Sequence, residues 1–234
     1  MIELNDLYAV LKARFGFLNW WPADSKEEVI TGAILTQQTS WKNVEKAISN
    51  LKSARVISVE KLANINLKKL EKLVKPSGFY KQKAKRIKNF MRYVNQNYGT
   101  LENLFNKNPV ELREELLKLH GVGKETADSI ILYAAEKPVF VVDAYTKRII
   151  ERVYGLKMEY TELQNFIQSN TKKNTAFYKD FHAQFVELGK NYCKTKPLCD
   201  DCPLNVFCKF YSNLKKTITP QNSRQKDEGA RLDF

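Results

Sequence analysis

Apolar residues recur at intervals of three and four along most of this chain, whereas alternating β-branched runs are scarce. This spacing predicts amphipathic helices, because one face of an α-helix repeats every 3.6 residues. In the segment 108–119, Leu112, Leu116 and Leu119 share one face behind an Asn-Pro start that suits a first helical turn. The pattern therefore predicts an all-α fold.

Two further helices are expected after this segment. The first helix should stop at Gly121, and a second should run from near Lys124 until Pro138 ends it. A short apolar run, 139–142, then leads to Asp143 and to a third helix that ends at Gly155. Residues 212–234 are polar and show no apolar period, so they predict a flexible tail. The alternative for its last four residues, Arg-Leu-Asp-Phe, is a peptide that docks on a partner protein.

The chain has 234 residues, enough to bury a core as one domain or as two small domains that share a groove. Its formal net charge of +13 favours a polyanionic partner, although many basic proteins carry only solvated lysines. The N-terminus lacks a signal peptide and no apolar run is long enough for a membrane span. We expect an intracellular monomer of the cytoplasm or nucleoid with no membrane partner.

The four cysteines of the chain lie close together, in the pattern C-x5-C-x2-C-x5-C. They are Cys193, Cys199, Cys202 and Cys208. In a reducing compartment such a cluster indicates metal ligation rather than disulfides. A [4Fe–4S] cluster and a Cys₄ zinc site both remain open, but zinc ribbons usually pair two C-x2-C knuckles and only one is present.

The sequence LHGVGKETA around Gly121 and Gly123 can serve two purposes. Glycines let backbone N–H groups approach an anion at a helix start, and Lys124 adds a positive charge. The alternative is a plain turn between helices. Asp143 is similarly ambiguous, because an aspartate directly before a helix is often only its N-cap.

Taken together, the order helix, L-x-G-V-G-K, helix, apolar run, Val-Asp, helix resembles the helix-hairpin-helix base-excision DNA glycosylases of the endonuclease III superfamily. The resemblance implies two helical domains flanking a DNA-binding cleft, with a six-helix domain at 25–138 and a second domain made of 1–24 and 139–211. It implies that Asp143 is the catalytic carboxylate. The hairpin residues that would hold a DNA phosphate are Gly121, Gly123, Lys124 and Thr126.

In that superfamily the C-terminal cysteine loop holds an iron–sulfur cluster. The resemblance therefore implies a [4Fe–4S] cofactor, although the first gap is five residues here and usually six in the family. The partner implied is double-stranded DNA that contains a damaged base.

Glu125 separates two kinds of glycosylase. Bifunctional endonuclease III enzymes have G-V-G-R-K-T-A, whose second basic residue forms a Schiff base, whereas this chain has G-V-G-K-E-T-A. A glutamate cannot form an imine, and Lys124 lies one position early, about 100° around a helix. The resemblance thus favours a monofunctional enzyme.

The segments WWPA, ILTQQTSWKNVEKA, GKETADSI and VVDAYTKR are similar to the endonuclease III-like 3-methyladenine DNA glycosylases. This similarity implies a base pocket walled by Trp41 and by one of Trp20 and Trp21, although core packing is the alternative for each tryptophan. Glu125 is expected to line the same pocket, without an assigned role. Gln38 matches the position of the wedge that fills the space of a flipped nucleotide, and the turn with Phe79 and Tyr80 would press on the opposite base. The adenine-mispair branch is disfavoured because it has a glutamate where this chain has Ala33.

The predicted function is base excision repair by a DNA N-glycosylase that hydrolytically removes alkylated purines such as 3-methyladenine or 7-methylguanine. The alternatives are a glycosylase/lyase acting on oxidised pyrimidines or mismatched thymine, and a non-catalytic DNA-binding module. His120 and His182 are expected to be structural. The basic run of Lys81, Lys83, Lys85, Arg86 and Lys88 predicts either a face that follows the DNA backbone or a solvated helix face.

Overall fold

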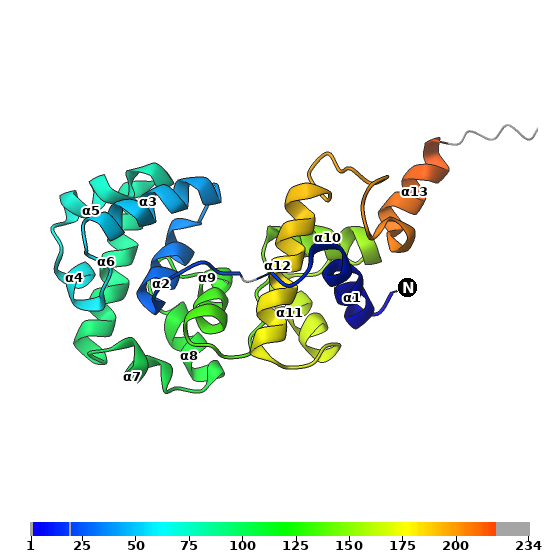
Figure 1. Cartoon of the computed structure of the whole chain (residues 1–234). Coiled ribbons are helices and arrows are strands. Elements are labelled where there is room, and N and C mark those ends of the chain that lie inside the picture. The colour runs from blue at the N-terminus through cyan, green and yellow to red at the C-terminus, as the bar shows by residue number, and fades with distance from the viewer. Residues whose placement is uncertain (1, 19, 219–234) are drawn as a thin grey trace, which may run out of the picture.

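The structure is a computed structural model that describes residues 2–18 and 20–218. Helices and connecting loops make up these residues, and no strand occurs among them (Figure 1). The prediction of an all-α fold is confirmed. Within the same residues, no helix is long and apolar enough to cross a membrane.

The middle of the chain forms one group of helices (Figure 1). In order they are α2 (Lys26–Leu35), α3 (Trp41–Ser53), α4 (Val59–Asn64), α5 (Leu67–Val74), the 3-10 turn η1 (Lys75–Ser77), α6 (Tyr80–Asn97), α7 (Leu101–Phe105), α8 (Pro109–Leu117) and α9 (Lys124–Ser129), which continues into a π-helical turn, η2 (Ile130–Ala134). Every residue of α2 from Glu28 to Leu35 is buried, because α3, α6, α9 and η2 all pack against it. Helix α2 is therefore the centre of this group.

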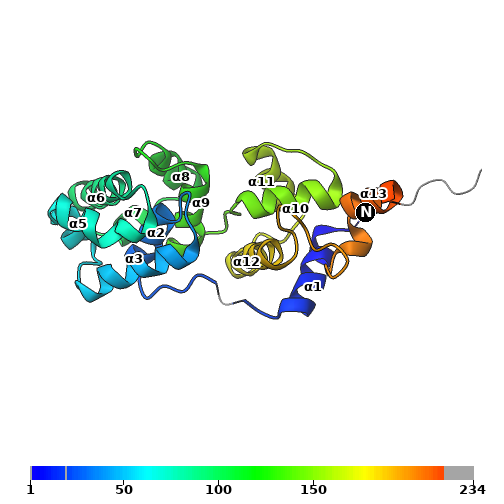
Figure 2. The same cartoon turned by 90° about the horizontal axis from the view of Figure 1, so that it is seen from above.

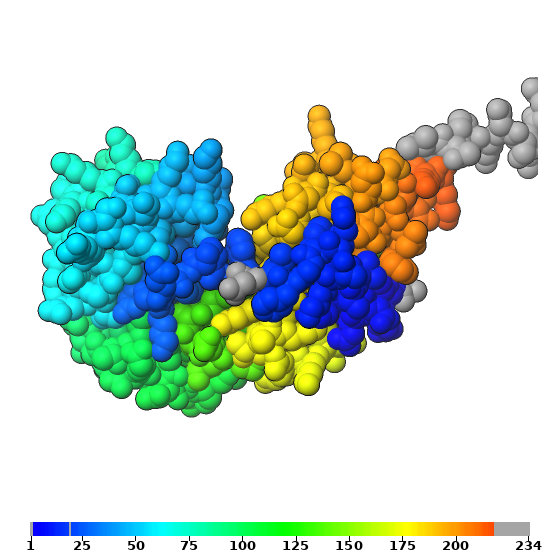
Figure 3. All heavy atoms as spheres, viewed as in Figure 1, coloured from blue at the N-terminus to red at the C-terminus, as the bar shows by residue number. Residues whose placement is uncertain are grey.

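The two ends of the described chain meet in a second group (Figure 2). It contains α1 (Leu4–Phe15), α10 (Ala144–Tyr154), α11 (Tyr160–Ser169), α12 (Thr175–Asn191), the 3-10 turn η3 (Asn205–Phe207) and α13 (Lys209–Ile218). Helix α12 packs between α1 and α10, and its buried Phe181 and Phe185 stack at a centroid distance of 4.6 Å. The surface is hollowed between the two groups (Figure 3).

The helices around the glycine corner agree with the expected order but differ in detail. Helix α8 begins at Pro109, where Asn108 Oδ1 accepts hydrogen bonds from two backbone N–H groups at 3.0 Å each. It ends at Leu117 rather than at Gly121, and turns lead into the corner. Gly121 has φ of 86°, a left-handed angle that favours glycine.

The C-terminal segment departs from the expected tail. Residues 212–218 belong to α13, so the prediction of a flexible tail is wrong for them. Three contacts attach α13 to the rest of the protein: Tyr211 is buried, its hydroxyl donates a hydrogen bond to Asp200 Oδ1, and the helix packs on α10. The rest of the expected tail, with the Arg-Leu-Asp-Phe end, lies outside the described residues.

Candidate active site

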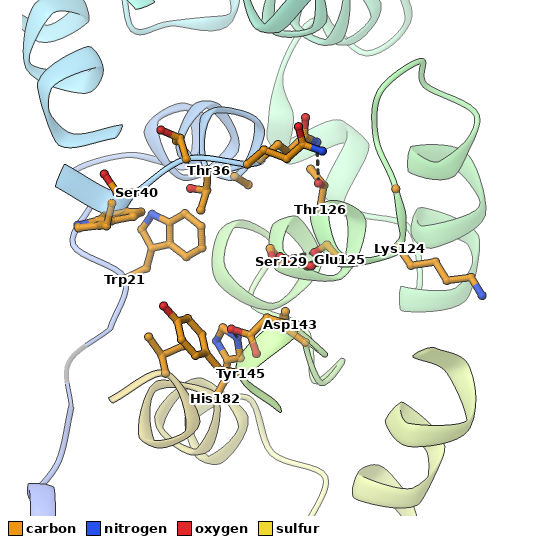
Figure 4. A pocket seen from close by; sticks show the side chains of 18 of the residues that line it. Trp21, Thr36, Ser40, Lys124, Glu125, Thr126, Ser129, Asp143, Tyr145 and His182 are labelled. Carbon is orange, nitrogen blue, oxygen red and sulfur yellow. Dashed lines mark hydrogen bonds and ion pairs between the residues drawn. The ribbon is translucent and has the colours of Figure 1, made fainter. Parts of the chain in front are cut away.

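A cavity of about 870 Å³ lies where the two groups of helices face each other. Its walls come from the Trp20–Trp21 segment, the loop 36–41, α9, the start of α10 and the middle of α12. Figure 4 shows Trp21 on one side of this space and Asp143, Tyr145 and His182 on the other. The volume is within the range of small-molecule sites, so a nucleobase with part of its sugar fits by size.

Asp143 is the N-cap of α10 and faces the cavity. Its Oδ1 accepts hydrogen bonds from the backbone N–H of Thr146 at 2.7 Å and from the Thr146 hydroxyl at 2.8 Å. These bonds occupy one carboxylate oxygen only. The capping role and a chemical role are therefore compatible, because Oδ2 is left to face the cavity and His182.

The surroundings of Asp143 keep it ionised. Burial disfavours the carboxylate, but the nearby His182 imidazole and the two Thr146 donors outweigh that cost, and the pKa of Asp143 lies below its ordinary value. The side chain is 13% exposed, which leaves a route to the cavity. The site therefore holds a fixed negative charge at neutral pH.

His182, on α12, was expected to be structural, and the structure places it beside Asp143. Its Nε2 is buried, has no hydrogen-bond partner among the described residues, and lies 3.7 Å from Asp143 Oδ2. Its Nδ1 is 2.7 Å from the hydroxyl of Tyr133, whose pKa is raised by burial, then by Asp143 and Asp180. Because that hydroxyl stays protonated and donates to Nδ1, we assign the ring proton to Nε2, towards Asp143.

The three tryptophans meet at one end of the cavity. The ring centroids of Trp20 and Trp21 lie 5.3 and 5.4 Å from that of Trp41. Trp21 also packs on Tyr133 and on Gly32, where a Cβ would be 3.2 Å from the indole. Lys190 Nζ lies 4.8 Å from the Trp20 ring, so this indole already faces a cation.

Glu125 is on α9 and shares the cavity with Asp143 (Figure 4). Its side chain is accessible to water inside the cavity, but the walls withdraw it from bulk solvent. Burial and then the charge of Asp143 raise the pKa of Glu125, while His182 and Lys147 act in the opposite direction. The two carboxyl groups thus differ: one is held ionised and the other is biased towards protonation.

The expected DNA contacts occupy two kinds of position. Gln38, Phe79, Gly123, Lys124 and Thr126 line the cavity, whereas Tyr80 and Gly121 do not. Thr126 is 7% exposed, and its hydroxyl accepts a hydrogen bond from Gln37 Nε2 at 3.0 Å. Lys124 points away from the cavity, with Nζ 2.9 Å from the Thr161 hydroxyl (Figure 4).

The basic residues on α6 do not all share one environment, so the run is neither a fully solvated helix face nor a continuous DNA-facing one. Lys83 is 1% exposed and donates to two backbone carbonyls, and Lys88 donates to the carbonyl of Ile65. The expectation of a single role for the run is therefore wrong. Lys81 and Lys85 are the members that are exposed.

The four cysteines line one small apolar cavity between α10, α12 and α13. Arg152 Nη1 donates to Cys193 Sγ at 3.3 Å, and burial raises the pKa of Cys202 to about 11. Within the described residues, no group of three or more His, Cys, Asp or Glu is arranged to hold a single metal ion. A set of four thiols in apolar surroundings, with a donor aimed at sulfur, fits an iron–sulfur cluster, whose thiolates surround several metal ions.

A glycine hairpin and a buried ionised carboxylate beside a base-sized cavity define a helix-hairpin-helix DNA glycosylase. The chain belongs to the HhH-GPD superfamily of base excision DNA repair proteins, which matches residues 31–173. The predicted membership in the endonuclease III superfamily and the predicted enzyme class are confirmed.

Individual relatives agree with this assignment. A candidate DNA repair glycosylase of Methanocaldococcus jannaschii is 48% identical over 206 residues, which cover 86% of this chain and 94% of that protein. Endonuclease III of Thermotoga maritima is 33% identical over 198 residues, with coverage of 82% and 88%. The solved structure of H. pylori 3-methyladenine DNA glycosylase, bound to 1,N6-ethenoadenine, has a TM-score of 0.73 and 31% identity, and covers 81% of this chain and 98% of that one.

Proposed function

We propose that this DNA glycosylase removes alkylated purines of the 3-methyladenine and 7-methylguanine type and leaves an abasic site with an intact strand. The observation that carries the proposal is the composition of one cavity. Asp143, which is held ionised, lines this cavity together with three tryptophans and Glu125. By the resemblance to bifunctional endonuclease III enzymes, Glu125 stands where those enzymes have the Schiff-base lysine. The likeness to the H. pylori 3-methyladenine DNA glycosylase supports the same substrate class.

The cavity suits an electron-poor base. A purine alkylated at N3 or N7 carries positive charge, and electron-rich rings attract it by stacking and cation–π contact, on the order of 0.5–2 kcal/mol per ring. Because Lys190 already covers part of Trp20, we assign most of this attraction to Trp21 and Trp41. The negative charge of Asp143 adds to the preference.

Asp143 performs the chemical step. As the bond from C1′ to the base nitrogen breaks, the base leaves with the electron pair and positive charge develops on the sugar. The Asp143 carboxylate stabilises that charge and takes a proton from the water that forms the new bond to C1′. A cationic base leaves as a neutral molecule, so this substrate class needs no strong general acid.

Glu125 contributes to the pocket without covalent chemistry. A carboxylate cannot condense with the sugar aldehyde, and Lys124 points away from Asp143 (Figure 4). The raised pKa of Glu125 limits the negative charge next to Asp143. The proposal is therefore a monofunctional enzyme.

DNA would lie across the hollow between the two helix groups, which we propose as domains 25–138 and 1–24 with 139–211. Gln38 and Phe79, which are both exposed, would fill the space left by the extruded nucleotide, and Tyr80 follows Phe79 in the chain. The hairpin at Gly121–Thr126 would hold a phosphate through its backbone N–H groups. The four cysteines would hold a [4Fe–4S] cluster, which would supply a structural cross-link for the loop 193–208.

The test is base release from a panel of duplexes that contain 3-methyladenine, 7-methylguanine, thymine glycol or mismatched thymine. We expect release of the alkylated purines, and a loss of at least about a hundredfold in Asp143→Asn with duplex affinity retained. Asp6→Asn, which removes an exposed carboxylate on α1, is the matched control and should behave as wild type. Absence of alkylpurine release by the unaltered protein would overturn the substrate class.

The second candidate is a glycosylase/lyase of the endonuclease III kind, favoured by the 33% identity with the T. maritima enzyme. Borohydride separates the two, because it traps a Schiff base as a covalent protein–DNA adduct. The unaltered protein should give no adduct. A trapped adduct would replace the monofunctional proposal with the second candidate.

A further inference from the structure

Helix α6 carries a lysine that is almost fully enclosed. Lys83 is 1% exposed, and its Nζ donates to the backbone carbonyls of Leu35 at 2.9 Å and Ser77 at 2.6 Å. Burial, and then the charge of Arg86, lower the pKa of Lys83 to about 8. Because burying an ammonium group is costly, these two bonds must supply something that an apolar side chain would not.

The two carbonyls belong to the ends of separate elements. Leu35 is the last residue of α2, and Ser77 is the last residue of η1. Gln38 follows the first end and Phe79 the second, and both have left-handed backbone angles, with φ of 54° and 43°. Such angles in residues other than glycine persist only when surrounding contacts hold them.

These two residues are also the exposed tips that face the cavity. Phe79 is 62% exposed, an unusual state for a phenylalanine, and Gln38 is exposed as well. The Lys83 ammonium group therefore joins the ends of the two elements from which the loops with Gln38 and Phe79 continue.

Arg86, one turn further along α6, makes a third link. Its Nη1 donates to Gln37 Oε1 at 2.5 Å, and Gln37 Nε2 donates to the Gly121 carbonyl and to the Thr126 hydroxyl, both at 3.0 Å. A Cβ at Gly121 would lie 2.3 Å from Arg86 Nε, so the hairpin passes directly over this side chain. The glycine at 121 is thus required by close packing as well as by its φ.

We propose that Lys83 and Arg86 are positioning residues that lock the Gln38 loop, the Phe79 loop and the Gly121 hairpin into one rigid DNA-facing unit. The inference rests on the proposed function, in which Gln38 and Phe79 hold the duplex open. Lys83 does not contact phosphate, because it is closed to solvent. Because the three segments are already fixed relative to one another, Gln38 and Phe79 enter the duplex without a further loss of conformational freedom in their loops.

The test compares Lys83→Met and Arg86→Met with Lys85→Met, which removes an exposed charge from the same helix. One readout is the fluorescence of 2-aminopurine opposite an abasic-site analogue, which reports insertion of the tips whatever the substrate class. The others are affinity for undamaged duplex and single-turnover base release. We expect both positioning variants to lose the fluorescence change and to slow release by about tenfold to a hundredfold, with undamaged-duplex affinity equal to that of Lys85→Met.

If Lys83→Met does not fold, as judged by its circular dichroism melt, Arg86→Met and Gln37→Leu carry the test. A wild-type fluorescence change in a folded positioning variant would overturn the proposal. Loss of undamaged-duplex affinity beyond that of Lys85→Met would also overturn it, because that result indicates phosphate binding. Failure of the substrate class has a different signature, since the fluorescence change would then persist in the unaltered protein without release of alkylated purines.

Discussion

The imidazole Nε2 of His182 lies 3.7 Å from the Asp143 carboxylate, across the floor of the cavity. Helix α12 supplies the histidine and the N-terminus of α10 supplies the acid. The Tyr133 hydroxyl holds the far side of the ring at 2.7 Å. From this arrangement we infer that His182 acts on the proposed chemistry through Asp143, by holding that carboxylate ionised.

The first prediction concerns pH. Since His182 lowers the pKa of Asp143, His182→Phe should raise it, and less carboxylate will be present at a given acidic pH. The acid limb of the rate profile for base release should therefore move to higher pH. Tyr133→Phe keeps His182 and should move the limb less. An unchanged acid limb in His182→Phe would show that the contact does not influence Asp143.

The parts of this site that are local in sequence could be predicted, and the parts assembled from distant elements could not. Asp143 could be singled out because the order of glycine hairpin, apolar run and Val-Asp in the chain resembles that of a known glycosylase superfamily. His182 gave no such signal, because its relation to Asp143 exists only once α12 packs on α10. For the same reason, the spacing of lysines on α6 could not show that Lys83 is buried under two carbonyls.

The second prediction concerns base selection. Trp41→Leu should weaken release of cationic 7-methylguanine by roughly twofold to thirtyfold relative to neutral hypoxanthine, because one aromatic ring is lost. Trp41→Phe keeps a ring and should retain most of the preference. Competition between the two lesions in one duplex pool measures the ratio. Equal losses for both bases would show that Trp41 packs without selecting charge.

The third prediction concerns the reaction type. Glu125→Lys places an amine in the cavity beside Asp143, at the position that carries the nucleophile in bifunctional relatives. Borohydride should then trap a covalent adduct on DNA that already contains an abasic site. Glu125→Gln, which keeps the shape without an amine, is the control and should give none. The absence of an adduct from Glu125→Lys would mean that the amine cannot reach C1′.

The fourth prediction concerns the cysteine loop. The purified protein should contain iron and inorganic sulfide in equal amounts, with broad visible absorbance. Cys202→Ala should lose both together, because it removes one of the four thiols that would hold the cluster, a partly buried one whose pKa is raised. Val206→Ala, which alters an exposed side chain of the same loop, should keep both. Stoichiometric zinc in the native protein would contradict the cluster.

The fifth prediction concerns the link between the two helix groups. Asp128, on α9, is fully buried and accepts hydrogen bonds from Arg113 on α8 and from Tyr160 and Gln164 on α11. Burial and then Asp128 raise the pKa of Tyr160, so its hydroxyl remains a donor at neutral pH. Gln164 also donates to the Phe140 carbonyl, in the segment that leads to Asp143. Asp128 therefore fixes the segment that leads to Asp143 and joins α9 to α11 through hydrogen bonds.

Asp128→Ala should lower the free energy of unfolding by about 3–5 kcal/mol, since it leaves the Arg113 charge and two donors without their acceptor. Glu136→Ala is the control, because the Glu136–Lys179 pair at 2.8 Å is exposed on the glutamate side and should contribute at most about 1 kcal/mol. Urea denaturation of both variants measures the difference. The double variant Arg113→Met with Asp128→Leu should recover part of the loss, because it removes the uncompensated charge together with its partner. Equal losses for Asp128→Ala and Glu136→Ala would show that the network does not join the two groups.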